Sequence, residues 1–300
     1  MDHISRKVQY SVAGDEIVGT FYLPTGSDQA NLGCVVLGHG WGMVAGGDLE
    51  DYAKAIVARG LAALTFDYRN LGKSGGAPRQ HIDPSKQVED YKAAISFVRS
   101  QPEVDGARIG VWGSSYGGGH ALTVTATDPR VRCVVSQVPT ISSWQAARAR
   151  MDQAAWSGQW QTFIADREAV FHGAEPATIQ SVSEDPDAPV AYRGRDSFDY
   201  MTEEGRNCPE WRNYTTIASL ELARNYEPGS YLYRITDVPV LMIIADSDTI
   251  TPTDLQRAAF TALSTEKKLL VVQGGHYSVY REHFQTTSTA AADWFAAHLK

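Results

Sequence analysis

One five-residue stretch, Gly113-Ser114-Ser115-Tyr116-Gly117, constrains this chain more than any other segment. It has the pattern Gly-x-Ser-x-Gly, follows the apolar run 108–112, and precedes residues that can continue as a helix. In such a strand–turn–helix elbow, glycines avoid clashes across the turn and the serine hydroxyl projects from the sheet edge. Only Ser115 fits the centre, because centring the pattern on Ser114 would require glycine at the position of Trp112.

Strand and helix patterns alternate around this stretch. Short apolar runs, typical of buried parallel strands, occur at 34–38, 62–66, 133–138, 238–244 and 268–272. Helical patterns lie between them at 49–59, 83–98, after Pro252 and at 284–299. Strands at 8–12 and 17–23, joined by a turn at Gly14-Asp15 and followed by a loop at 24–28, come first. The order predicts an α/β fold with a mostly parallel sheet flanked by helices.

The alternation stops between about residues 140 and 235. A helix over about 144–172 would place Trp156, Trp160 and Phe163 on one face. We therefore assign 1–139 and 236–300 to the α/β core and 140–235 to an inserted, mainly helical lid. The aromatic stripe fits packing of the lid onto the core as well as lining of a pocket, so both interpretations stay open.

A serine hydroxyl needs a base within hydrogen-bond reach, and the base needs an orienting partner. The best base is His276, on a glycine-rich loop after the last predicted strand. The best acid is Asp248, after the strand that ends near Ile244, with Asp246 as its rival. The order Ser115, Asp248, His276 is that of α/β-hydrolases.

These features together resemble an α/β-hydrolase fold serine hydrolase over nearly the whole chain. The matching residues are Ser115 in its elbow, His39-Gly40-Trp41-Gly42, Asp67-Tyr68-Arg69 with Gly72 and Ser74, Asp248 and His276. The elbow is similar to that of prolyl oligopeptidases and Xaa-Pro dipeptidyl-peptidases. The chain length and the residues around Asp248 and His276 resemble the dienelactone-hydrolase-like and fungal polyketide-transferase-like group. Dienelactone hydrolases proper use a cysteine nucleophile, and this chain has Ser115 instead.

The resemblance implies further roles. It favours Asp248 over Asp246, since the acid stands three residues after the small residue that closes the strand. The backbone N–H groups of Tyr116 and Trp41 are expected to form the oxyanion hole. We expect structural roles for two histidines and for an acid–base pair after a strand end, namely His39, His120, Asp67 and Arg69.

Composition narrows the partners. A net charge of −8 argues against nucleic acid, which needs a basic surface. No apolar run is long enough to span a bilayer and residues 1–7 lack a signal-peptide core, so we expect no membrane association and a cytoplasmic protein. Cys34 and Cys133 lie in apolar runs and are predicted to be buried thiols. No Cys and His residues have the spacing of zinc ligands, and we expect no metal or organic cofactor. A homodimer is compatible with the resemblance.

The lid is expected to select the substrate. Its aromatic residues favour a partly apolar small molecule, with Trp144, Trp156, Trp160 and Tyr277 as candidate binding residues. Arg148, Arg150 and Arg167 could contact a carboxylate, although a solvated helix face explains them as well. The favoured reaction is hydrolysis of an ester, thioester or lactone through an acyl-enzyme. Alternatives are an Xaa-Pro peptidase or amidase, a carbon–carbon bond hydrolase, an acyltransferase and a non-catalytic binding protein.

Overall fold

A central sheet organises the computed structural model, which describes residues 3–26 and 30–300. Met1, Asp2 and the end of the loop expected at 24–28 lie outside the described residues. Within that part of the chain, eight strands pair in the order β1-β2-β4-β3-β5-β6-β9-β10. They are β1 (His3–Val12), β2 (Asp15–Pro24), β3 (Leu32–Gly38), β4 (Ala62–Phe66), β5 (Val104–Ser114), β6 (Val131–Gln137), β9 (Val240–Ala245) and β10 (Lys267–Val272). All pairs from β4 to β10 are parallel, and β1 and β2 add an antiparallel edge.

The first hairpin turns one residue earlier than expected. Val12 pairs with Asp15, so Ala13 and Gly14 form the turn rather than Gly14 and Asp15. Both turn residues have positive φ, 51° and 95°. A two-residue turn of this hand follows the twist of the strands, and its second position is suited to glycine.

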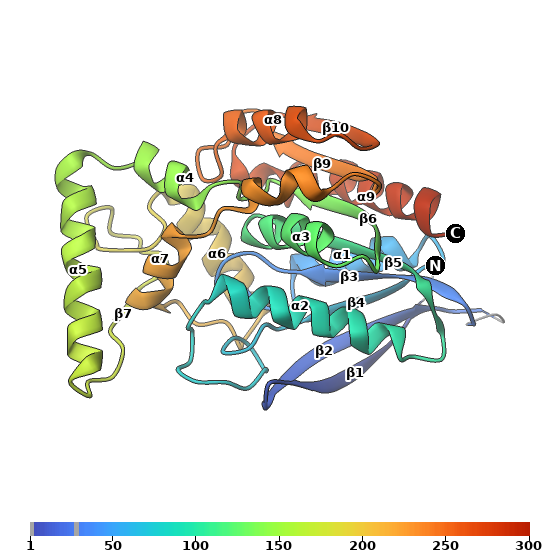
Figure 1. Ribbon diagram of the computed structural model, residues 1–300, viewed down its shortest axis with the longest axis horizontal. Helices are drawn as coiled ribbons and strands as arrows, with labels where there is room; N and C mark the ends of the chain where they lie inside the picture. The colour runs from blue at the N-terminus through green and yellow to red at the C-terminus, as the bar shows by residue number, and fades with distance from the viewer. Residues whose placement is uncertain (1–2, 27–29) are drawn as a thin grey trace.

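Helices cover both faces of the sheet, as Figure 1 shows. They are α1 (Asp48–Val57), α2 (Pro84–Arg99), α3 (Tyr116–Thr127), α8 (Thr253–Ala262) and α9 (Phe284–Leu299). Side chains of β3 alternate between two apolar clusters: Val36 packs with α2 and α3, whereas Val35 and Leu37 pack with α1 and α9. The sequence therefore predicts the buried parallel strands correctly, because each one is apolar on both faces.

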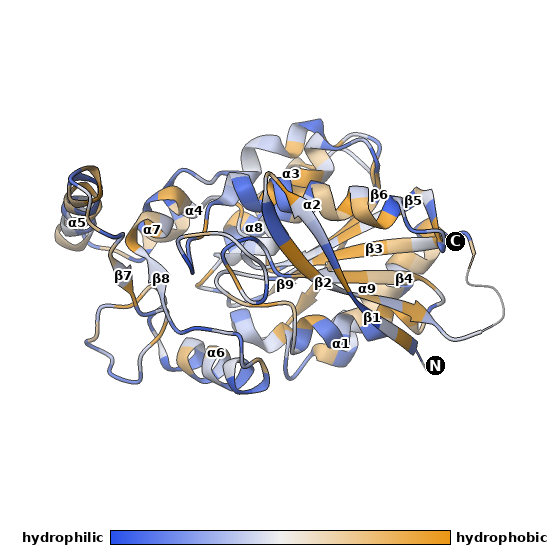
Figure 2. Ribbon diagram, turned by 90° about the horizontal axis from the view of Figure 1, so that it is seen from below, coloured by the Kyte–Doolittle hydropathy of each residue, from blue (hydrophilic) through white to orange (hydrophobic). Residues whose placement is uncertain are grey.

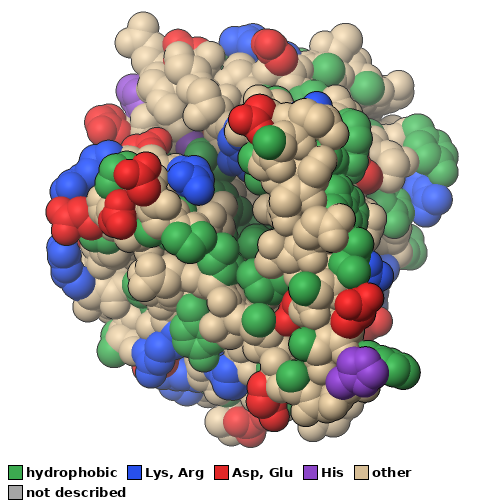
Figure 3. All heavy atoms as spheres, turned by 90° about the vertical axis from the view of Figure 1, so that its left-hand side faces the viewer, with side chains coloured by type: hydrophobic (Ala, Val, Ile, Leu, Met, Phe, Trp, Pro, Cys, Tyr) green, Lys and Arg blue, Asp and Glu red, His purple; other side chains and the backbone are tan. Residues whose placement is uncertain are grey.

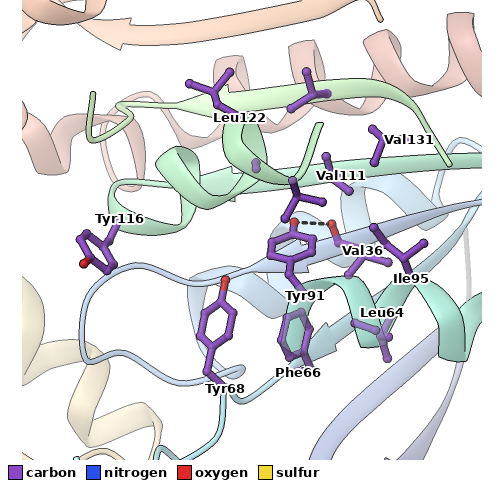
Figure 4. Packing of buried hydrophobic residues seen from close by; sticks show 14 of the residues in the cluster. Val36, Leu64, Phe66, Tyr68, Tyr91, Ile95, Val111, Tyr116, Leu122 and Val131 are labelled. Carbon is purple, nitrogen blue, oxygen red and sulfur yellow. Dashed lines mark hydrogen bonds between the residues drawn. The ribbon is translucent and has the colours of Figure 1, made fainter. Parts of the chain in front are cut away.

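The apolar layers also hold buried polar groups in place. In Figure 4, the Tyr91 hydroxyl on α2 reaches β3 and donates to the Val36 carbonyl at 2.9 Å. Figure 2 shows the surrounding interior as hydrophobic colour along the central strands. Because β3, β5, β6, β9 and β10 are parallel, their carboxyl ends lie at one edge of the sheet. This edge is where ligands of α/β folds bind.

Residues 138–239 leave the sheet between β6 and β9. They contain α4 (Ser143–Ala149), α5 (Gln153–Phe171), α6 (Arg195–Asn207), α7 (Ile217–Arg224), a 3-10 helix η1 (Pro228–Arg234), and a short antiparallel pair, β7 (Thr178–Ile179) with β8 (Thr215–Thr216). The single helix expected over 144–172 is wrong, since the chain breaks between α4 and α5. Asp152 accepts a hydrogen bond from the Ala155 N–H at 2.8 Å and so starts a new helix. In Figure 1, α5 stands well away from the sheet.

Candidate active site

Ser115 occupies a strained turn between β5 and α3. Its backbone has φ 57° and ψ −119°, a region that residues with side chains rarely adopt. A Cβ on Gly113 would lie 1.9 Å from the Gly117 carbonyl oxygen, and one on Gly117 would lie 2.4 Å from the His39 carbonyl oxygen. Glycine is therefore required at both positions by close approach, and the serine side chain is left at the surface of the turn.

The three residues expected to form a triad lie in hydrogen-bond contact. Ser115 Oγ is 3.0 Å from His276 Nε2, and His276 Nδ1 is 2.8 Å from Asp248 Oδ2. Because the carboxylate can only accept, Nδ1 carries the proton and Nε2 is free to accept from the serine hydroxyl. His276 and Asp248 are buried, whereas Ser115 is partly exposed. The arrangement has the geometry of a nucleophile, a general base and an orienting acid.

The loop after β9 distinguishes Asp248 from Asp246. Asp248 points inward, where Oδ1 accepts the N–H groups of Ile250 and Thr251 at 2.8 and 2.9 Å. The exposed Asp246 instead accepts the Gly274 N–H at 2.9 Å and has no contact with the histidine. Asp246 therefore joins two loops, and Asp248 alone of the pair meets His276.

The carboxylate of Asp248 is stabilised in its charged form. Burial acts to raise its pKa, but the electrostatic interaction and hydrogen bond with His276, helped by Thr251, outweigh burial and hold the pKa below the usual value. The Thr251 hydroxyl lies 2.7 Å from Asp248 Oδ2 and 3.1 Å from His276 Nδ1. Asp248 is thus ready to orient the imidazole and to balance its charge.

The loop after β3 lies directly over the serine. A Cβ on Gly40 would be 3.3 Å from Ser115 Cβ and 3.8 Å from its Oγ. Trp41 follows Gly40, and its ring packs edge-on against Tyr116, with centroids 5.0 Å apart. Tyr116 is the first residue of α3, where backbone N–H groups lack partners within the helix. The expected oxyanion donors, Trp41 and Tyr116, therefore flank the nucleophile.

Four polar residues singled out beside the triad brace the scaffold. Burial lowers the pKa of His39 to about 4 and that of His120 to about 3, so both are neutral. The ring of His120 lies between Tyr226 and Gln87, at 2.6 and 2.8 Å. Asp67 accepts the N–H groups of Ala45 and Lys73, and Arg69 pairs with the buried Asp90 at 2.6 Å. Asp67 and Arg69 thus hold loops through separate partners.

A pocket opens beside Ser115 and His276. Its walls come from the loop after β3, the start of α1, the segment around Tyr192, α6 and the His276 loop. The residues that line it include Trp41, Met43, Val44, Asp48, Leu49, Trp112, Tyr192, Tyr200, Met201, Glu204, Cys208, Tyr277 and Tyr280. The lining is largely aromatic and aliphatic, which suits a partly apolar ligand.

Of the four candidate binding residues, the structure brings only Tyr277 to this pocket. Trp156 lies between Trp144 and Trp160 in a chain of edge-on rings, with centroids 5.8 and 6.1 Å apart. The chain continues to Phe163, which is buried in the core cluster. Trp156 and Trp160 lie outside the pocket lining because α5 stands away from the sheet edge, and Trp144 on α4 lies outside it as well.

The insertion reaches the pocket instead through α6 and the segment before it. Tyr192 is held there because its N–H donates to the Ser181 carbonyl at 2.9 Å. From α6, the Tyr200 hydroxyl donates to Asp48 Oδ2 at 2.8 Å, and Glu204 Oε2 accepts the Asp48 N–H at 3.0 Å. Sequence reasoning missed α6, although Tyr200, Met201 and Glu204 have helical spacing.

Asp48 and Glu204 form a carboxyl pair at the pocket wall. Burial, reinforced by the nearby charge of Glu204, raises the pKa of Asp48 to about 7. Burial also raises the pKa of Glu204. The pair joins the start of α1 to α6, so it connects the core to the insertion.

The raised pKa of Asp48 predicts a pH-dependent stability. The folded protein favours the protonated carboxyl of Asp48. Its contribution to the free energy of unfolding is therefore full below pH 3.8, the pKa in the unfolded chain, and is lost as the pH rises to about 7, the pKa in the folded protein. Asp48→Asn cannot ionise, and we expect its melting temperature relative to wild type to rise with pH. The difference in melting temperature between Asp48→Asn and wild type should grow by roughly 5–10 °C from pH 5 to pH 8, equivalent to about 2–3 kcal/mol. A constant difference across that range would contradict the shift.

The described residues contain neither a candidate metal site nor a candidate membrane-spanning helix. No three His, Cys, Asp or Glu side chains there are grouped as metal ligands. No helix among residues 3–26 and 30–300 has the length and apolar character needed to cross a bilayer. Cys34 and Cys133 are buried, and burial raises the pKa of both thiols well above the usual value, which makes them inert core residues.

The sheet, the strained serine turn and the sheet-edge pocket define an enzyme of the α/β-hydrolase class. More specifically, the chain belongs to the X-Pro dipeptidyl-peptidase (S15) family, whose model matches residues 13–278. This agrees with the elbow, which resembles that of Xaa-Pro dipeptidyl-peptidases.

Curated relatives and solved structures cover most of the chain. It is 32% identical over 253 residues to the quorum-quenching protein AidA of Acinetobacter baumannii, covering 82% of this chain and 80% of that protein. It is 29% identical over 263 residues to the thiohydrolase aneE of Aspergillus aculeatus, covering 86% and 81%. The structure of DcsB in complex with its substrate analogue has a TM-score of 0.87 at 25% identity and 99% coverage of each chain.

Proposed function

We propose that this protein hydrolyses an acyl bond, a thioester or carboxylic ester, of a partly hydrophobic small molecule. The observation that carries the proposal is the contact series Ser115–His276–Asp248, at 3.0 and 2.8 Å, opening on an apolar pocket. Relatives named thiohydrolase and polyketide transferase favour a thioester among the possible acyl donors. The insertion expected at residues 140–235 acts as the lid of the pocket, which it reaches through Tyr192 and α6.

The mechanism follows from the contacts of His276, whose Nδ1 faces Asp248 and whose Nε2 faces Ser115. His276 Nε2 takes the proton of Ser115, whose oxygen attacks the acyl carbon, and the tetrahedral oxyanion is held by the N–H groups of Trp41 and Tyr116. His276 then gives its proton to the leaving sulfur or oxygen, which leaves an acyl-enzyme. Water, deprotonated by His276, releases the acid and restores Ser115. Asp248 keeps the imidazole oriented and stabilises its charged form in both steps.

A panel of substrates tests the reaction class: a thioester and an ester of the same butyryl group, a four-carbon lactone and a dipeptide anilide. Butyryl N-acetylcysteamine, p-nitrophenyl butyrate, γ-butyrolactone and a Gly-Pro anilide are compared by kcat/KM. We expect the thioester and ester to react at least about a hundredfold faster than the lactone and anilide. A butyryl thioester and ester that react no faster than in buffer would contradict the proposal.

The family and the Asp48–Glu204 pair favour a second candidate, an exopeptidase. A free N-terminal ammonium would find two carboxyl groups at the pocket wall. Preferential cleavage of the Gly-Pro anilide, lost when its amine is acetylated, would select this candidate over the thioesterase. The hydrogen bond from the Asp48 N–H to Glu204 already gives the pair a structural role, so we rank this function second.

A further inference from the structure

Two arginines of the insertion lie over the ring of Trp156, and a third interacts with one of them. The guanidinium carbons of Arg148 and Arg224 lie 5.7 and 5.9 Å from the centre of its ring, on residues from α4 and α7. Arg150, one residue beyond α4, acts electrostatically on Arg224. The Arg224 guanidinium donates to the neutral Gln159 Oε1, at 3.1 and 2.7 Å. Two cations thus lie over the Trp156 ring, and a third interacts electrostatically with one of them.

No carboxylate within residues 3–26 and 30–300 forms an ion pair with any of the three. Arg167 on α5 shows the contrast, because it pairs with Glu221 at 3.3 Å. The acids closest along the chain are engaged elsewhere: Asp152 caps α5, and Glu227 accepts from the Ser142 hydroxyl at 2.8 Å. Within the described residues, the positive charges of Arg148, Arg150 and Arg224 are therefore not balanced by an adjacent carboxylate.

Burial and, to a smaller extent, the charge of Arg150 together lower the pKa of Arg224 to about 10. Arg224 therefore stays charged at neutral pH. Its positive charge is partly removed from water and is repelled by Arg150. Attraction to a bound anion would offset both the loss of hydration and the repulsion. A guanidinium also presents paired N–H donors that match carboxylate and phosphate oxygens.

The cluster lies next to the catalytic residues. The Arg150 guanidinium donates to the Ile250 carbonyl at 3.4 Å, and the Ile250 N–H donates to Asp248 Oδ1. Tyr192 lines the pocket, and both Arg150 and Arg224 act electrostatically on its phenol. Figure 3 looks onto this end of the molecule, where hydrophobic side chains lie in a hollow and both basic and acidic side chains stand around it.

We propose that Arg150 and Arg224 bind an anionic group of the substrate, a carboxylate or a phosphate, beside the Tyr192 wall of the catalytic pocket. The inference rests on the proposed acyl hydrolysis and names a substrate class for it. The anion has two possible sources, a phosphate on the carrier of a thioester or a carboxylate on the acyl chain.

The kinetic test uses charged and neutral partners with matched acyl groups. Butyryl-CoA is compared with butyryl N-acetylcysteamine, and p-nitrophenyl hemiglutarate with p-nitrophenyl butyrate. In Arg150→Gln and in Arg224→Gln we expect the kcat/KM ratio of charged to neutral substrate to fall about tenfold, mainly through KM. Arg167→Gln, on the same lid but paired with Glu221, should leave the ratio unchanged. The wild-type preference for the charged substrate should also weaken as the salt concentration is raised from roughly 0.05 M to roughly 0.5 M, because salt screens the attraction between the arginines and the anion.

If the kcat/KM ratio falls only for the CoA pair, the bound group is a phosphate. If it falls only for the hemiglutarate pair, the bound group is a carboxylate. Either result supports the proposal. An unchanged ratio in both arginine variants, or a wild type that shows no preference for either charged substrate, overturns it. Calorimetric binding of CoA and of glutarate to Ser115→Ala protein separates this from catalysis. If neutral esters are not hydrolysed, the proposed function fails, whereas weakened anion binding in Arg224→Gln still measures the subsite.

Discussion

Ser115→Ala is expected to lower kcat for p-nitrophenyl butyrate by at least about ten-thousand-fold and to abolish covalent labelling by a fluorophosphonate. The substitution removes the oxygen that lies 3.0 Å from His276 Nε2, so no acyl-enzyme can form. The measurement is steady-state hydrolysis together with intact mass after labelling. A residual rate within a hundredfold of wild type would show that another group attacks the substrate.

The adjacent serine supplies the matched control. Ser114 Oγ lies 2.5 Å from the Tyr280 hydroxyl and 3.3 Å from Gln137 Nε2, in a buried network that does not include His276. Ser114→Ala leaves these partners unsatisfied, so we expect a stability loss of about 1–2 kcal/mol. Full labelling of Ser114→Ala by the fluorophosphonate, together with none of Ser115→Ala, assigns the nucleophile.

Asp248→Asn is expected to lower kcat by about a thousand- to ten-thousand-fold with a small change in KM. An amide at this position can donate to His276 Nδ1 and so favours the tautomer whose Nε2 carries the proton and cannot accept from Ser115. It also removes the charge that balances the imidazolium during the reaction. Steady-state kinetics at constant pH, with a thermal melt to verify folding, measures the effect.

Asp246→Asn provides the comparison on the same loop. Its side chain is exposed and accepts from Gly274 and Ser247, both away from the imidazole. We expect kcat within about fivefold of wild type, because no reacting atom is touched. If Asp246→Asn were the more damaging of the two, the assignment of the orienting acid to Asp248 would be reversed.

Much of the core could be predicted because its signals are local. A buried parallel strand is apolar on both faces, so the runs at 34–38 and 62–66 mark β3 and β4 without knowledge of their neighbours. The Gly-x-Ser-x-Gly pattern of the elbow is also local, and the clash at Gly113 arises within the turn itself, whereas the clash at Gly117 comes from the distant His39 carbonyl. Chain order then placed Asp248 and His276 after the last two strands.

The insertion was harder to predict for the opposite reason. Trp156 and Trp160 have the spacing of an amphipathic stripe, but that spacing does not state which surface the stripe meets. In the structure it faces Trp144 and Phe163 rather than Ser115. The helix break at 150–152 depends on capping by Asp152, which competed with a continuous apolar pattern.

The sequence by itself determined the α/β layers, the position of the elbow and which of two adjacent serines stands at its centre, because the patterns that mark them each lie within a short stretch of chain. Only the tertiary structure decided what lines the pocket. Asp48 meets Glu204 across 156 positions, and Arg150 approaches Ile250 across 100. Such contacts are set by how the insertion packs on the sheet edge, and no local pattern encodes that geometry.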